Sequence, residues 1–147
     1  MFIFVFESVL ISPHPNFLSS LVKLIALFIT IDKPDAPGKP LVSDITENTM
    51  TLTWTAPQTD GGSPITSYVI EKKERFSVRW SPVEETGTPE LSYTVTGLTE
   101  GSEYDFRVVA KNKAGAGTPS DATGFNLAKP PYGKIGLFDT TETHKNV

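Results

Sequence analysis

A strict alternation of polar and apolar residues at positions 49–55 decides the fold. It reads Thr49-Met50-Thr51-Leu52-Thr53-Trp54-Thr55. Successive side chains of a strand point to opposite faces, so Met50, Leu52 and Trp54 share one face and the threonines the other. This pattern predicts a half-buried strand, with Trp54 as a large apolar side chain for the core.

The same alternation recurs downstream, between turn signals. Strands are predicted over 65–73, 78–84, 91–96, 103–111 and, closing the set, 123–128. An extended lead-in is predicted over 35–40, a loop over 60–64 and a hairpin-like loop over 113–119. The six predicted strands and the extended lead-in make seven short segments without helical periodicity, and these indicate an all-β fold, a seven-stranded antiparallel β-sandwich with an extra hydrophobic N-terminal segment. Periodicity alone leaves a closed barrel as the alternative.

The inward positions of these strands give the predicted core. It consists of Leu52, Trp54, Tyr68, Ile70, Tyr93, Val95, Leu98, Tyr104, Phe106 and Val108. Trp80, in the strand over 78–84, is expected to pack under the sheet edge, and exposure as an interaction residue is the alternative.

Composition excludes several classes of function. The chain has 147 residues, of which 38% are hydrophobic and 20% charged, as in a globular protein. The formal net charge of −4 leaves no basic domain to bind nucleic acid. Cysteine is absent, which excludes a disulfide framework, a thiolate metal site and a cysteine nucleophile. The only histidines, His14 and His144, lie near opposite ends, so no histidine metal or catalytic cluster is expected.

Catalytic motifs are also missing. Gly115 and Gly117 lack the third glycine of a dinucleotide-binding loop, and there is no Gly-x-Ser-x-Gly elbow. Glu84 and Glu85 are adjacent, so on a strand they point to opposite faces and do not form an acid–base pair. We therefore expect no catalytic, cofactor-binding or metal-binding residues, no cofactor and no small-molecule substrate.

Residues 1–31 differ from the rest of the chain. They hold 20 apolar residues and two charges, Glu7 and Lys23. The apolar run over 17–31 is shorter than the ~20 residues of a membrane span, and no basic residue precedes Lys23 as a signal peptide would require. Three interpretations stay open: a stretch that is not genuine coding sequence, an atypical signal-anchor, or an amphipathic helix packing on the domain.

The segment over 33–129 resembles a fibronectin type III domain. The resemblance rests on Leu52-Thr53-Trp54-Thr55-Ala56-Pro57, on 60–73, on Tyr93-Thr94-Val95-Thr96-Gly97-Leu98, on 104–108 and on 110–120. Pro37-Gly38-Lys39-Pro40, Asp60-Gly61-Gly62-Ser63-Pro64-Ile65 and Asn112-Lys113-Ala114-Gly115 are similar to the domains of the giant muscle proteins titin, twitchin and projectin. Residues 1–31 and the tail over 130–147 depart from the family.

The resemblance implies a function and a location. It implies a non-enzymatic module of a sarcomeric scaffold that spaces filament-binding sites, bears load and contacts protein partners such as thick-filament proteins in the cytoplasm. It also implies that Tyr104 is a tyrosine corner, whose hydroxyl bonds the backbone of the preceding loop. The alternative is an extracellular adhesion or receptor module, with residues 1–31 as a membrane signal-anchor.

Overall fold

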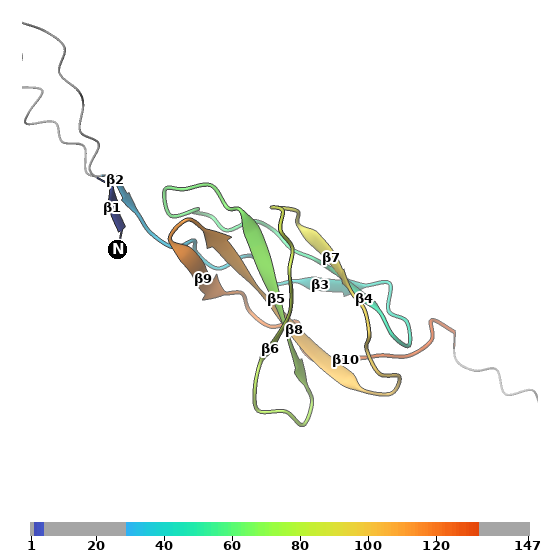
Figure 1. Cartoon of the computed structure of the whole chain (residues 1–147). Coiled ribbons are helices and arrows are strands. Elements are labelled where there is room, and N and C mark those ends of the chain that lie inside the picture. The colour runs from blue at the N-terminus through green and yellow to red at the C-terminus, as the bar shows by residue number, and fades with distance from the viewer. Residues whose placement is uncertain (1, 5–28, 133–147) are drawn as a thin grey trace, which may run out of the picture.

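The computed structural model describes residues 2–4 and 29–132, which form antiparallel sheets (Figure 1). One sheet has the order β3-β4-β7, made of Leu41–Ser43, Met50–Thr53 and Ser92–Val95. The second has the order β10-β8-β5-β6, made of Asn126–Leu127, Glu103–Asn112, Ser67–Glu74 and Ser81–Glu85. A further strand, β9 (Gly115–Pro119), also pairs with β8. Apart from these, β1 (Phe2–Phe4) pairs with β2 (Ile29–Ile31).

Strands β9 and β10 share one position in the second sheet. β9 pairs with β8 between Val109 and Asn112, and β10 pairs with β8 at Glu103 and Tyr104. They are two parts of one interrupted edge strand. Counted this way, the two sheets hold seven strand positions. The predicted seven-stranded β-sandwich is confirmed, and the alternative of a closed barrel does not hold.

The core lies between the two sheets. Inward side chains of β4, β5 and β8 are buried there because alternate positions of each strand face the opposite sheet. The fully or almost fully buried side chains are Met50, Leu52, Trp54, Tyr68, Ile70, Val95, Leu98, Tyr104, Phe106 and Val108. Tyr93, by contrast, is only partly buried and packs against the margin of this cluster.

Trp54 occupies the core together with Tyr68. Their rings meet edge to face with centroids 5.3 Å apart, which is a favourable aromatic geometry. The indole Nε1 of Trp54 is buried, and no group among the described residues accepts its hydrogen. The site is therefore held by packing and not by a hydrogen bond from the indole.

The structure differs from the sequence prediction at 113–119. A hairpin-like loop was expected there because of its glycines, but Gly115–Pro119 forms β9. A sheet ladder needs only backbone groups, and Gly115 pairs with Asn112 across a two-residue turn. The loop prediction was therefore wrong for most of its length.

Strand boundaries differ elsewhere as well. The strand predicted from residue 78 begins at Ser81, and Val78 is 93% exposed in the turn before it. The closing strand predicted over 123–128 shortens to Asn126–Leu127. A three-residue strand, β3, follows the predicted extended lead-in.

Candidate functional site

Three segments meet at one end of the sandwich, around the side chain of Asn112. The amide Nδ2 of Asn112 donates to the carbonyl oxygens of Asp32 and Asp60, at 2.7 Å each. Its Oδ1 accepts from the amide of Ala114 at 2.8 Å. The amide of Asp32 also donates to the carbonyl of Gly61 at 2.8 Å. We call Asp32, Asp60, Gly61 and Asn112 the Asn112 clamp, because together they fix the incoming chain between two loops.

Glycine makes this close approach possible. Gly61 has a φ of +75°, and a Cβ placed on it would lie 2.1 Å from the carbonyl oxygen of Asp32. A Cβ on Gly117, in β9, would lie 2.0 Å from the carbonyl oxygen of Pro34. Both positions therefore need glycine because another backbone segment packs directly against them. Gly61 also needs it for its left-handed backbone conformation.

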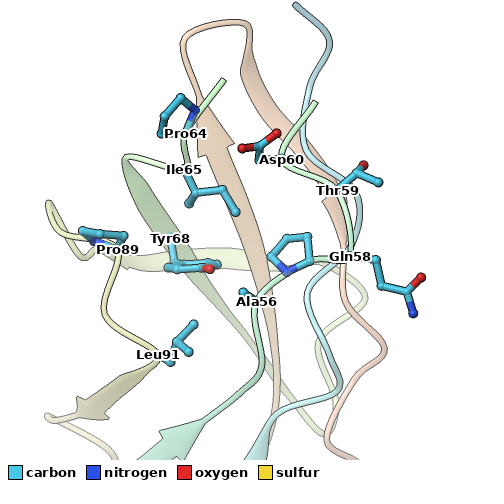
Figure 2. A pocket seen from close by; sticks show the side chains of 10 residues that line it. Ala56, Gln58, Thr59, Asp60, Pro64, Ile65, Tyr68, Pro89 and Leu91 are labelled. Carbon is cyan, nitrogen blue, oxygen red and sulfur yellow. The ribbon is translucent and has the colours of Figure 1, made fainter. Parts of the chain in front are cut away.

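A groove of about 670 Å³ opens beside the clamp (Figure 2). Apolar residues from four loops and strands form most of its walls. The lining comprises Ala56, Pro57, Gln58, Thr59, Asp60, Pro64, Ile65, Tyr68, Pro89 and Leu91. Figure 2 shows the ring of Tyr68 between Ile65 and Leu91, with its hydroxyl directed toward Ala56. Burial raises the pKa of Tyr68, so the phenol is protonated at neutral pH.

The opposite end of the sandwich contains the tyrosine interaction that the resemblance implied. The amide of Thr99 donates to the hydroxyl oxygen of Tyr104 at 3.1 Å. Tyr104 is itself buried, with its ring stacked near Phe106. This is the hydrogen bond of a tyrosine corner, which ties the loop before β8 to the core.

The outer face of the second sheet carries paired charges. Glu71 pairs with Arg107 and Lys73 with Asp105 across the neighbouring strands β5 and β8, and Glu85 of β6 reaches over β5 to Lys111 of β8. The partly buried ring of Trp80 lies under Lys73 and Arg107, with 4.7 and 4.5 Å between each cation and the ring centroid. Trp80 thus packs on this sheet face, and the pairing leaves no cationic stripe for nucleic acid there.

The adjacent carboxylates of β6, Glu84 and Glu85, contact different residues. Glu85 accepts hydrogen bonds from Lys111 and Ser67, and these lower the pKa of its carboxyl. Glu84 pairs in register with Ile70 and makes none of these contacts. The residues that the structure describes contain no cluster of three or more metal-ligating side chains. They also contain no helix that could span a membrane.

Asn112 and Gly61 belong to motifs that carry the family resemblance, but the sequence did not predict that they form the clamp. The partners of Asn112 lie 80 and 52 residues away in the chain, and no local pattern links them. The groove was missed as well, although its proline-rich loops, at Pro57, Pro64 and Pro89, were visible in the sequence.

Comparison with known proteins identifies the domain. The sequence model of the fibronectin type III domain matches residues 35–125. The chain belongs to the fibronectin type III family. The predicted family resemblance is therefore confirmed, and the buried Trp54 and the corner at Tyr104 are parts of a fibronectin type III sandwich.

Relatives of this fibronectin type III domain include muscle proteins. Cardiac-type myosin-binding protein C of Mus musculus is 39% identical over 116 residues, which cover 77% of this chain and 9% of the relative. A crystal structure of domains from titin is 40% identical with a TM-score of 0.63, covering 67% of this chain and 33% of that one. A putative receptor-type tyrosine-protein phosphatase of Aedes aegypti is 37% identical over 107 residues, covering 70% of this chain and 8% of the relative.

The match to the curated relatives is local. The matched part of this chain spans less than a tenth of the length of the cardiac-type myosin-binding protein C relatives. Fibronectin type III domains are in general non-enzymatic modules.

Proposed function

We propose that this domain is a load-bearing spacer and protein-interaction module of a sarcomeric scaffold in the muscle cytoplasm, with thick-filament proteins among its partners. The similarity to myosin-binding protein C and to titin supports the sarcomeric setting. The observation that carries the mechanical part is the path of the chain through the sandwich.

The chain enters and leaves at opposite ends of β8. The clamp lies at Asn112, the last residue of β8, whereas Gly101 and Ser102, just before β8, bond the backbone of Ala128 at the exit. Ten residues of strand span about 30 Å. Figure 1 shows the described chain entering near β9 and leaving beyond β10. Tension along the chain therefore passes through the whole sandwich.

Both ends are anchored by hydrogen bonds rather than left as loose tails. At entry, Asp32 bonds Gly61 and Asn112, and β3 pairs with β4. At exit, β10 pairs with β8 and Ala128 exchanges bonds with Gly101 and Ser102. Extension requires these bonds to break first, which gives the domain resistance to force. We assign it no catalytic role.

The localisation test uses an antibody raised against residues 33–129. In isolated myofibrils of the source animal, the antibody should stain a stripe at a fixed position in each sarcomere. Myofibrils without a repeating stripe would contradict the scaffold proposal. Staining of intact, unpermeabilised cells would favour the second candidate, an extracellular adhesion or receptor module, which the similarity to the receptor-type phosphatase supports.

A further inference from the structure

The groove beside Tyr68 has walls that suit an apolar chain. Leu91 is 40% exposed, and Pro64 and Pro89 are exposed while Ile65 is half-buried. Proline has no backbone N–H, so these walls present ring carbons and few backbone donors. An extended segment that carries aliphatic or proline side chains would bury surface here.

The hydroxyl of Tyr68 is a hydrogen-bond donor in the groove. Tyr68 is 1% exposed and lines the groove. Within residues 29–132, no hydrogen bond is made to its hydroxyl, and burial is the sole cause of its raised pKa. The hydroxyl is not fully buried, since Trp54 Nε1 is the one buried side-chain atom without a partner among the described residues. Because Tyr68 lines the groove, its hydroxyl is reached from the groove, where a carbonyl oxygen of a bound chain would accept the O–H.

The rim of the groove is acidic. Among the described residues, Asp60 is the only charged one in the lining, and Glu90 is exposed between the two lining residues Pro89 and Leu91. No lysine or arginine of residues 29–132 lines the groove. Complementary charge steers association and excludes wrong partners more than it adds affinity. A segment flanked by lysine or arginine therefore fits this rim, and one flanked by acidic residues does not.

We propose that this groove docks an extended, apolar segment of a partner protein that carries lysine or arginine beside the apolar residues. The segment lies between Ile65 and Leu91 and accepts the Tyr68 O–H at a main-chain carbonyl. Extended proline-rich chains leave their carbonyls free for such contacts. This inference rests on the proposed role of the domain as a protein-interaction module and specifies its partner. It does not depend on the proposed load-bearing role.

The test is a titration of the full ¹⁵N-labelled chain with capped peptides, followed by amide chemical shifts. The probes are Lys-Pro-Leu-Pro-Leu-Pro-Lys, the same peptide with glutamate in place of lysine, and Lys-Gly-Ser-Gly-Ser-Gly-Lys. The first should cause saturable shifts at Ala56, Ile65 and Leu91. The glutamate peptide and the glycine–serine peptide should each bind at least several-fold more weakly.

Point variants distinguish a binding role of the Tyr68 hydroxyl from an effect on folding. Tyr68→Phe keeps the buried ring and should weaken binding of the first peptide roughly two- to tenfold, as expected for one lost hydrogen bond. Tyr93→Phe, which removes a hydroxyl from the other sheet, is the matched control and should leave affinity unchanged. Asp60→Asn removes the charge but keeps an oxygen that can accept the hydrogen bond from the amide of Gly62. It should reduce the difference in affinity between the lysine and glutamate peptides.

Several results would overturn the proposal. They are the absence of saturable shifts at millimolar peptide, shifts centred outside the groove, and equal affinity of Tyr68→Phe and the unchanged chain. Equal binding of the lysine and glutamate peptides would also overturn it. Groove shifts that depend on protein concentration without peptide would assign the surface to a second copy instead. None of these outcomes alters the myofibril staining, so failure here is distinct from failure of the scaffold proposal.

Discussion

At the scale of single residues, the domain depends on a few polar groups that tie loops to the core. The Tyr104 hydroxyl accepts from Thr99, and the Asn112 amide bonds two loops and the incoming chain. The spacing of Tyr104 after Leu98, together with the family resemblance, predicted the first. The second could not be predicted, because its partners are remote in sequence.

The hydroxyl of Tyr104 gives the first prediction. Tyr104→Phe should lower the free energy of unfolding by ~0.5–1.5 kcal/mol, and by up to ~3 kcal/mol if the Thr99 N–H is left without a partner. Urea titration measures the loss. Tyr93→Phe is the control and should stay within about 0.5 kcal/mol of the unchanged chain. Equal stability of both variants would show that the Tyr104 hydroxyl does not anchor the loop.

The carboxylate of Glu85 gives a prediction on pH. Its hydrogen bonds with Lys111 and Ser67 lower its pKa in the folded state below the ordinary value of 4.5. The stabilisation is therefore complete above that ordinary value and is lost as the pH falls through the lowered one. Glu85→Gln should flatten the fall in thermal unfolding temperature below pH 4.5, whereas Glu84→Gln should not. An unchanged pH curve for Glu85→Gln would contradict this assignment.

At the scale of elements, alternation predicted strands where one face is buried. The stretch over 49–55 became β4, and that over 103–111 became β8, because Leu52 and Phe106 point into the core while their neighbours point away. Prediction failed at β9, where Gly115 and Gly117 resemble a turn, but Gly115 pairs with Asn112 and Gly117 lies at the register shift between the pairs of Ala116 and Pro119. Position 117 needs glycine because its backbone approaches the carbonyl of Pro34, and no local sequence pattern predicts this tertiary contact.

Two glycines, Gly61 in the Asn112 clamp and Gly97 in the loop before β8, give a prediction by direct comparison. Gly61 and Gly97 both have positive φ, at +75° and +69°, but only a Cβ on Gly61 meets backbone, whereas one on Gly97 meets nothing within 4 Å. Both alanine variants carry a conformational cost of ~1–2 kcal/mol. Gly61→Ala should lose at least ~1 kcal/mol more, because the Asp32 carbonyl must move.

Amide hydrogen exchange locates that loss. The amide of Asp32, which donates to Gly61, should exchange faster in Gly61→Ala and at the usual rate in Gly97→Ala. Equal stability of the two variants, with equal protection of Asp32, would show that the clamp does not hold the incoming chain.

At the scale of the whole molecule, the sandwich should fold without its hydrophobic N-terminal segment. All seven strand positions of the two sheets lie after residue 40, and the bonds of Asp32 to Gly61 and Asn112 involve no residue before Asp32. A chain in which a single start methionine replaces residues 1–31 keeps the Asp32 amide, and it should give a dispersed amide spectrum with that amide still protected. A collapsed spectrum would show that residues 1–31 belong to the domain and that the boundary near residue 33 is wrong.

The central claim is that force along the chain meets one cooperative unit. Lys33 and Lys129 are exposed at the two ends, and the chain has no cysteine of its own. Lys33→Cys and Lys129→Cys therefore give two unique handles on the full chain for pulling a single molecule. Roughly 95 residues at ~3.3–3.6 Å each extend to about 30 nm, far beyond the folded length.

Pulling between these handles is the most direct test. The account predicts a single all-or-none extension of nearly that length, at a force set by the unfolding rate, followed by rapid refolding on release. Gly61→Ala should lower the unfolding force, while Gly97→Ala should lower it less. Gradual extension at very low force, without a discrete step, would contradict the load-bearing role and leave the domain as a docking module.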